Sequence, residues 1–311
     1  MDAQDFKPVP AVYQIELTNR CNLKCPMCLR TTDMVRGTDL LDIGLLELMV
    51  ARGEFNGTSY VELQLAGEPT LHPHLGDIID YLHTRAFVRV GLSTHGLLIG
   101  KRPGVLDALL KLDNLTISVD SVDPAVYAQM RYPAKFSQLE EALDTLFAAY
   151  GDRATPVVDL QLVRTPLVAG SGDAPALQAM IDRKGWPAAV RVTHDCFIEM
   201  QGREGHTSRR NDLCVNPWLT VSVTHTGDVL SCCYIFDPDP DSLNYYGNLY
   251  VQSLAEIWSG PRVQAMRAMH RSGDLQGACA KCYQPSPALI HHNIQTRATQ
   301  RIAGRVHLPV Y

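Results

Sequence analysis

Long apolar runs, an export signal and an excess of basic charge are all missing from this sequence. No apolar stretch approaches the ~18 residues that a membrane-spanning helix requires. Residues 1–14, MDAQDFKPVPAVYQ, have neither the basic start nor the apolar core of a secretory signal peptide. The formal net charge of −5 provides no basic surface for nucleic acid or anionic lipid. These absences predict a cytoplasmic protein with no membrane and no nucleic-acid partner.

Cysteine is absent from residues 29–195, yet the whole chain contains nine cysteines. Disulfides are rare in a reducing compartment, so cysteines that cluster there usually bind metal or react. The clustering therefore predicts a metalloprotein. The nine positions are Cys21, Cys25, Cys28, Cys196, Cys214, Cys232, Cys233, Cys279 and Cys282.

Strand-like and helix-like stretches alternate over residues 1–195. Six strands that alternate with helices indicate an α/β fold with a parallel sheet and right-handed crossovers. In such folds the site lies at the C-terminal ends of the strands, and the first cysteines directly follow the first strand. The strands are predicted at 11–17, 59–67, 87–94, 114–120, 156–163 and 189–195. The helices are predicted at 42–53, 75–84, 104–111, 124–131, 137–150 and 173–184.

The pattern changes after residue 195. A β-hairpin is predicted at 218–234, with its turn at Thr226–Gly227. Two helices are predicted at 253–258 and 262–271, separated by a Gly-Pro pair. This part of the chain is therefore expected to form a small α+β domain.

The segment CNLKCPMC, residues 21–28, places three thiols on one short loop. Three is too few for a closed structural zinc site, which takes four ligands, and too many for one disulfide. A cube-shaped iron–sulfur cluster needs four iron ligands, so three cysteines leave one iron open to a substrate or cofactor. A degenerate zinc site or a chance grouping is the alternative, but no neighbouring His or Cys completes a tetrahedron. The spacing favours a [4Fe–4S] cluster held by Cys21, Cys25 and Cys28.

The stretch TNRCNLKCPMC resembles the signature of the radical S-adenosylmethionine (radical SAM) superfamily. The resemblance implies a partial (β/α)6 TIM-like barrel, in which the open iron chelates the amino and carboxylate groups of S-adenosylmethionine. One electron from the cluster then cleaves this cofactor to a 5′-deoxyadenosyl radical. A flavodoxin- or ferredoxin-type reductant is the implied electron donor.

Further motifs follow in the order that this superfamily shows. LAGEPTLHP (65–73) resembles the motif after the second strand that meets the amino group of the cofactor, with Ala66 where a glycine is common. STHG (93–96) lies where a ribose-contacting Thr-Asn-Gly is frequent, and ISVDSVDP (117–124) resembles the fourth-strand motif. The resemblance implies a cofactor pocket lined by Gly67, Glu68, Ser93, Ser118, Asp120 and Arg131. For the last three of these residues, turn formation and helix capping are alternative roles.

A second constellation of cysteines lies in the last third of the chain. It is similar to the start of the SPASM domain, which holds auxiliary clusters at the C-terminus of radical SAM enzymes. No cysteine follows Cys282, so the chain resembles the shortened version, the twitch domain, with one auxiliary [4Fe–4S] cluster. A four-cysteine zinc site is the alternative. Cys233 is expected to point away from the cluster along its strand, as a buried structural thiol. The expected ligands are Cys214, Cys232, Cys279 and Cys282, which close the cluster off as an electron-transfer centre.

These observations predict four parts along the chain. They are a radical SAM partial barrel at 1–195, a linker or cover segment at 196–213, a twitch domain at 214–284 and a tail at 285–311.

Three classes of function compete. Twitch-domain radical SAM enzymes of this size include aminocyclitol dehydrogenases and aminoglycoside epimerases, and the chain resembles these enzymes. Peptide-modifying enzymes generally carry the full SPASM domain, and many have a leader-binding domain that the residues before Cys21 are too few to form. A non-catalytic electron carrier would need neither an open cluster nor the cofactor motifs. The favoured function acts on a carbinol C–H bond of a small substrate with several hydroxyl or amino groups.

Three further residues have predicted roles in that chemistry. Cys196 follows the sixth strand, and its thiol is a candidate hydrogen donor for epimerisation; a buried inert thiol is the alternative. A dehydrogenase would instead lose a proton and pass an electron to the auxiliary cluster. Arg203 in the cover segment and Glu16 on the first strand are candidate substrate ligands, because a polar substrate needs charged partners. Arg203 could equally be a solvated linker residue.

Overall fold

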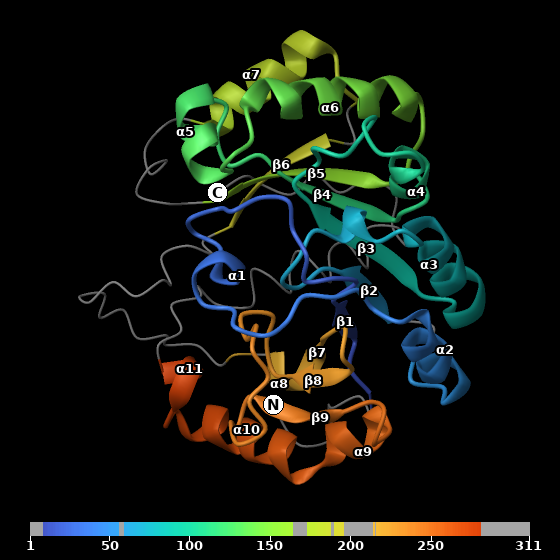
Figure 1. Ribbon diagram of the computed structural model, residues 1–311, viewed down its shortest axis with the longest axis vertical. Coiled ribbons are helices and arrows are strands. Elements are labelled where there is room, and N and C mark those ends of the chain that lie inside the picture. The colour runs from blue at the N-terminus through green and yellow to red at the C-terminus, as the bar shows by residue number, and fades with distance from the viewer. Residues whose placement is uncertain are drawn as a thin grey trace.

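In the part of the chain that the structure describes, nine strands form one continuous sheet in the order β6-β5-β4-β3-β2-β1-β7-β8-β9 (Figure 1). The computed structural model describes residues 9–55, 59–163, 173–187, 190–195, 214 and 216–280. The first six strands lie in sequence order and are parallel to their neighbours, as the sequence predicted. They are β1 (Val12–Ile15), β2 (Tyr60–Leu63), β3 (Arg89–Thr94), β4 (Asn114–Ser118), β5 (Val157–Val163) and β6 (Val190–Asp195).

A helical connection follows each of the first five strands and packs on one side of the curved sheet (Figure 1). Alternate strand residues are apolar and fully buried, and they join the helices in one hydrophobic cluster; Val61, Leu92 and Ile117 are examples. This cluster places the helices on the outer face, as in an open (β/α)6 barrel. The helices are α2 (Ile43–Ala51), α3 (Leu75–Tyr81) with its continuation η2 (Leu82–Ala86), α4 (Val105–Leu109), α5 (Pro124–Met130), α6 (Phe136–Tyr150) and α7 (Asp173–Lys184).

Local sequence explains where these helices begin. Asp42 accepts a hydrogen bond from the Gly44 amide and so caps α2. Asp123 caps α5 in the same way, through the amides of Ala125 and Val126. None of the helices in the described ranges is long and apolar enough to cross a membrane.

The C-terminal part of the chain extends the same sheet. Strand β7 (Thr220–Val223) pairs in parallel with β1, and β8 (Asp228–Leu230) and β9 (Tyr245–Asn248) continue antiparallel to it. The hairpin turn lies where the sequence predicted it, with Gly227 at a φ of +80°. The predicted small domain is therefore joined to the barrel through strand pairing.

Helices cover the end of this extension. They are α8 (Asn216–Leu219), α9 (Leu254–Ser259), α10 (Pro261–Ser272) and α11 (Gly277–Ala280). Ser253 and Glu256 form a capping box at the start of α9, and Gly260 separates α9 from α10, as predicted. The predicted linker at 196–213 and the tail at 285–311 lie outside the described residues.

Candidate active site

The three N-terminal cysteines lie on the loop that leaves the C-terminal end of β1. Cys25 is buried, and Cys21 and Cys28 are half-buried. The amide of Leu23 donates to the Cys21 sulfur at 3.4 Å, and the Cys28 amide donates to the Cys25 carbonyl at 3.1 Å. Cys28 is the residue before the short helix α1 (Leu29–Thr32). The loop thus holds three sulfur ligands on one short stretch of backbone.

The chemistry of these thiols suits a cluster better than a single ion or a disulfide. The described cysteines form no disulfide. Among the described residues, no three His, Cys, Asp or Glu side chains lie close enough together to bind one metal ion. Burial raises the pKa of Cys21 to about 11, so positive charge is needed to hold its thiolate form. Three spaced sulfurs fit the corners of a four-iron cube, which is larger than one ion.

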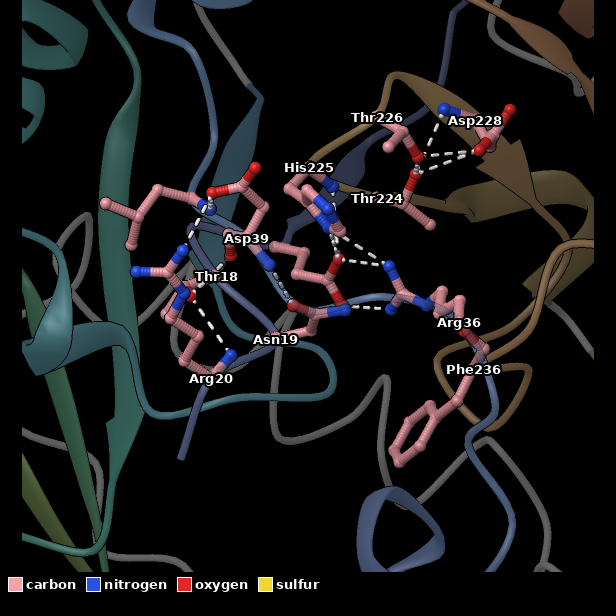
Figure 2. A network of polar contacts seen from close by, with 12 residues as sticks. Thr18, Asn19, Arg20, Arg36, Asp39, Thr224, His225, Thr226, Asp228 and Phe236 are labelled. Carbon is pink, nitrogen blue, oxygen red and sulfur yellow. Dashed lines mark hydrogen bonds and ion pairs between the residues drawn. The ribbon is translucent and has the colours of Figure 1, made fainter. Parts of the chain in front are cut away.

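Hydrogen bonds to the preceding residues fix the start of this loop (Figure 2). The Thr18 hydroxyl donates to the Asp39 carbonyl at 2.7 Å, and the Asn19 amide oxygen accepts from the Asp39 amide at 2.8 Å. The Arg30 side chain donates to the Asn19 carbonyl at 2.6 Å. The segment after the cysteines therefore folds back onto the segment before them, which closes the loop.

Gly67 lies directly against this loop. A Cβ atom at Gly67 would lie 2.1 Å from the Thr18 carbonyl oxygen and 2.6 Å from that of Arg20. The next amide, that of Glu68, donates to the Arg20 carbonyl at 2.8 Å. Only glycine fits where the β2 loop meets the cysteine loop.

The Glu68 carboxylate holds the loops after β2 and β3 together. It accepts hydrogen bonds from the Thr94 hydroxyl at 2.6 Å and from the His95 amide at 3.0 Å. It also accepts from the Thr70 amide at 3.1 Å, at the start of the short helix η1 (Pro69–Leu71). Ser93, the third predicted cofactor ligand, is half-buried on β3 and donates to Glu62 at 2.9 Å.

His95 is a residue of this site that the sequence predictions did not include. Its Nε2 lies 2.8 Å from Asn22 Oδ1, in the cysteine loop, and 3.3 Å from the Glu68 carboxylate. The neighbouring Glu68 carboxylate raises the pKa of His95, but burial lowers it by more. The net lowering favours the neutral ring. The sequence contained only a weak signal, since His95 replaces the Asn of the frequent Thr-Asn-Gly.

Asp120 and Arg131 form a buried ion pair at the C-terminal end of β4. Asp120 is fully buried with φ of +64°, a strained conformation for a residue other than glycine. Its Oδ1 atom has no hydrogen-bond partner among the described residues. The Arg131 cation lies beside Cys25 and opposes the rise that burial causes in the pKa of that thiol. Both residues thus lie at the cysteine loop, and half-buried Ser118 ends the same strand.

Glu16 lies on the other side of the cysteine loop, with its side chain fully buried. Its carboxylate accepts from Arg36 Nη1 at 2.7 Å and contacts His225 Nδ1 at 2.7 Å (Figure 2). Burial alone would raise the pKa of Glu16, but the bonds from His225 and Arg36 lower it below its usual value. Glu16 therefore binds two cationic or polar groups of the chain itself, and its predicted contact with substrate remains a prediction.

The described cysteines of the C-terminal part also come together. Asn216 Nδ2 lies 3.8 Å from the Cys232 sulfur, and the Cys279 sulfur lies 3.9 Å from Asn244 Oδ1. The thiols of Cys214, Cys232 and Cys279 all raise the pKa of Tyr246, so each of them lies near this one side chain. Cys282, the fourth predicted ligand, lies outside the described residues.

The prediction that Cys233 lies on a strand is wrong. Strand β8 ends at Leu230, so strand alternation no longer separates the side chains of Cys232 and Cys233. Their thiols are in contact, and this contact and burial raise the pKa of Cys232 well above its usual value.

Two family models match the chain. The radical SAM superfamily model matches residues 15–161, and the SPASM model, an iron–sulfur cluster-binding domain, matches residues 214–283. The chain carries a radical SAM domain and a SPASM domain. These domains bring S-adenosylmethionine, its [4Fe–4S] cluster and an auxiliary iron–sulfur cluster, which confirms the predicted family and cofactors.

Curated relatives match part of the chain. A GTP 3′,8-cyclase of Chlorobaculum tepidum is 28% identical over 201 residues, which are 62% of this chain and 54% of the relative. A GTP 3′,8-cyclase of Vibrio cholerae is 30% identical over 138 residues, which are 43% of this chain and 41% of the relative. The chain thus spans about half the length of the curated relatives it matches.

Solved structures match over most of the chain. BtrN in complex with AdoMet and 2-DOIA is similar to this chain with a TM-score of 0.56 and 16% sequence identity. The alignment covers 88% of this chain and 92% of the BtrN chain. The enzyme anSMEcpe with bound AdoMet has a TM-score of 0.62 at 16% identity, with 83% of each chain covered. These matches confirm the predicted partial barrel, whose sheet is open.

The inner face of the radical SAM sheet is polar. Gln14 pairs in register with Glu62 on one side and Ser222 on the other, and Thr116 pairs with Asp159. All five side chains are buried, although they alternate with the apolar residues that pack under the helices. Ser222 donates to Gln14 at 2.9 Å. The sequence did not predict this group of buried polar residues. In an alternating strand, polar residues are usually expected to face solvent, so each of them alone gave no sign of burial.

Two of the predicted site residues besides Cys282 lie outside the described residues. They are Cys196, which follows β6 in the sequence, and Arg203 of the predicted cover segment.

Proposed function

We propose that this chain is a radical SAM enzyme that removes a hydrogen atom from a carbinol C–H bond of a small substrate bearing several hydroxyl or amino groups. The polar inner face of the sheet is the observation that supports this proposal most. Buried Glu62 and Asp159 lie on the side of the sheet opposite the helices, together with Gln14 and Thr116. Glu62 already accepts a hydrogen bond from Ser93, and Gln14 accepts one from Ser222. Hydroxyl and amino groups of a substrate can form further hydrogen bonds with this polar face, whereas an apolar substrate cannot.

In this proposal Cys21, Cys25 and Cys28 hold the cluster that binds S-adenosylmethionine. When bound, the cluster and cofactor supply the 5′-deoxyadenosyl radical, with an electron from a flavodoxin- or ferredoxin-type reductant. The chain's own residues position that cofactor at the ends of β2, β3 and β4. These residues are Gly67, Glu68, Ser93, Ser118, Asp120 and Arg131.

The auxiliary cluster is proposed to be held by Cys214, Cys232, Cys279 and Cys282. Four cysteines would complete its ligation and leave no iron for substrate, so its role is electron transfer. Arg203 and Glu16 are the proposed charged partners of the substrate. Arg36 and His225 already contact the Glu16 carboxylate. A substrate would therefore have to share this carboxylate with them or displace one of them.

The proposed outcome of the reaction is epimerisation, with Cys196 as the hydrogen donor. Its place directly after β6, which ends at Asp195 at the same edge of the sheet as the cysteine loop, supports this role. The thiol S–H bond breaks as a new C–H bond forms on the opposite face of the substrate carbon. The sulfur radical would then take up one electron, supplied by the reductant through the auxiliary cluster, and one proton from solvent to restore the thiol.

Oxidation to a ketone is the second candidate, and the complete set of four cysteines in the SPASM domain favours it. The substrate radical would then lose a proton and one electron, and the auxiliary cluster would accept this electron. BtrN, which aligns over most of both chains, was solved with 2-DOIA, and this supports a substrate of the same chemical kind.

Anaerobic turnover in deuterated water tests the proposal. Reconstituted enzyme would be incubated with reductant, S-adenosylmethionine and a panel of aminocyclitols, aminoglycosides, GTP and cysteine-containing peptides. The Cys196 thiol exchanges its hydrogen for deuterium in this solvent. Epimerisation therefore predicts that one deuterium is transferred to a substrate carbon, and that the Cys196→Ala variant transfers none. A carbonyl product in the wild type would instead identify a dehydrogenase. Turnover of GTP or of a peptide alone would contradict the proposed substrate class.

A further inference from the structure

Tyr246 on β9 carries a buried hydroxyl group in the SPASM domain. The residue is 4% exposed, and its hydroxyl oxygen has no hydrogen-bond partner among the described residues. Buried hydroxyl groups in native proteins are nearly always hydrogen-bonded, because an unmade bond costs the full desolvation of the group. This hydroxyl therefore points to a partner that the described polypeptide does not supply.

The polar contacts around β9 bring this side chain to the cysteines. Asn244, two residues before Tyr246, accepts a hydrogen bond from Ser231 at 2.7 Å, and its oxygen lies 3.9 Å from the Cys279 sulfur. Ser231 directly precedes Cys232. Burial raises the pKa of Tyr246 most, and the nearby thiols of Cys279, Cys232 and Cys214 raise it further. The phenol thus lies among three of the proposed cluster ligands.

A cation, Arg267, also lies near Tyr246 and has other partners. Arg267 on α10 donates through Nε to the Pro217 carbonyl at 2.8 Å, and its guanidinium lies 4.6 Å from the centre of the Trp258 ring. The positive charge of Arg267 lowers the pKa of Tyr246. A guanidinium has no acceptor atom, so Arg267 cannot accept a hydrogen bond from the phenol. Of the charged neighbours of Tyr246, the cysteine sulfurs are the ones that can accept a hydrogen bond from its phenolic O–H.

We propose that Tyr246 donates a hydrogen bond from its hydroxyl to a sulfur atom of the auxiliary cluster and thereby raises the reduction potential of that cluster. Hydrogen bonds to cluster sulfurs stabilise the more negative, reduced state. Tyr246 is in this account a positioning residue that controls how readily the cluster takes up an electron. The inference rests on the proposed ligands Cys214, Cys232 and Cys279, but not on the identity of the substrate.

The chain offers a matched control one residue away. Tyr245 lies on the same strand, and its hydroxyl donates to Asp228 at 3.2 Å. Tyr245→Phe therefore removes the same atom from the same strand without removing a donor from the cysteines.

Redox titration of the auxiliary cluster, followed by electron paramagnetic resonance, tests the proposal. The full-length chain would carry Cys21, Cys25 and Cys28 replaced by alanine, so that the remaining signal belongs to the auxiliary cluster. Tyr246→Phe should shift the midpoint potential to a more negative value, and Tyr245→Phe should leave it unchanged. An unchanged potential in Tyr246→Phe, with the full iron content retained, would overturn the proposal.

A second replacement covers the case in which Tyr246→Phe fails to bind iron. Fluorotyrosine at position 246 keeps the ring and the hydroxyl group but makes the hydroxyl a stronger donor. The proposal predicts a shift to a more positive potential, opposite in sign to that of phenylalanine. No shift, or zinc in place of iron at this site, would contradict the proposal. Neither readout requires turnover, so a wrong substrate assignment would leave both results intact.

Discussion

Glu16 and Arg36 form a buried ion pair within the radical SAM domain, and each of the two residues also contacts the SPASM domain. Arg36 Nη1 donates to the Glu16 carboxylate at 2.7 Å, and the exposed fractions of the two side chains are 0% for Glu16 and 14% for Arg36. His225, in the β7–β8 turn, contacts the same carboxylate at 2.7 Å. The backbone amide of Arg36 donates to Asp237 at 3.0 Å, close in sequence to Cys232. This buried pair thus connects the segment after the first set of cysteines to the residues on either side of Cys232.

Replacing Glu16 by glutamine should destabilise the folded protein. The buried Arg36 cation would lose its counter-charge, and breaking a buried pair from one side costs about 3–5 kcal/mol. Urea denaturation of the reconstituted protein, followed by circular dichroism, measures this change. Glu47→Gln is the control, because Glu47 is exposed on α2 and its replacement should change the free energy of unfolding by less than about 0.5 kcal/mol. Equal effects of the two substitutions would contradict a structural role of the pair.

Replacing Gly67 by alanine should displace the cysteine loop. The added methyl group would lie 2.1 Å from the Thr18 carbonyl, and backbone atoms cannot move aside without disturbing the loop. Iron analysis after anaerobic reconstitution should then give about half of the wild-type iron, since only the auxiliary site remains intact. Gly37→Ala is the control, because no atom lies within 4 Å of a Cβ at Gly37. Full iron content in Gly67→Ala would show that the loop tolerates the contact.

The two sets of cysteines should each account for one cluster. The wild-type protein should bind about eight irons per chain, and replacement of either set by alanine should leave about four. The first set is Cys21, Cys25 and Cys28, and the second is Cys214, Cys232, Cys279 and Cys282. Metal analysis by mass spectrometry measures both iron and zinc. About four irons together with one zinc in the wild type would contradict the assignment of the second set.

Replacing Arg131 by lysine should weaken the binding of S-adenosylmethionine. Arg131 pairs through its Nε with buried Asp120 beside Cys25, and a lysine has no donor at the position of that Nε. We expect a loss of affinity of about tenfold or more, which corresponds to ~1.4 kcal/mol. Isothermal titration of the reconstituted protein measures this affinity. Arg183→Lys, on the exposed side of α7, is the control. An unchanged affinity in Arg131→Lys would limit the pair to a structural role.

Local patterns predicted most of the barrel correctly, because each strand and helix is encoded by its own periodicity. The predicted strand at 114–120 and helix at 173–184, for example, correspond to β4 and α7. The cysteine loop was also readable, since its three thiols lie within one short segment. Contacts between distant segments could not be read in this way.

The pairing of β7 with β1 is one of these distant contacts, because it joins residues about two hundred positions apart in the sequence. The contact of Glu16 with His225 depends on that same pairing. The end of β8 at Leu230 is a local feature, but the run of strand-like residues up to Tyr234 concealed it. Sequence periodicity therefore predicted the elements, whereas the joint between the two domains required the structure.

Transfer of a labelled hydrogen atom tests the central proposal most directly. An aminocyclitol that turns over would be prepared with deuterium on its carbinol carbons, one position at a time, and incubated with the reconstituted enzyme under anaerobic conditions. The proposal predicts that one labelled position, and no other, transfers deuterium to 5′-deoxyadenosine, which mass spectrometry detects as an increase of one mass unit. Unlabelled 5′-deoxyadenosine from every labelled substrate, alongside product formation, would contradict hydrogen abstraction from a carbinol carbon.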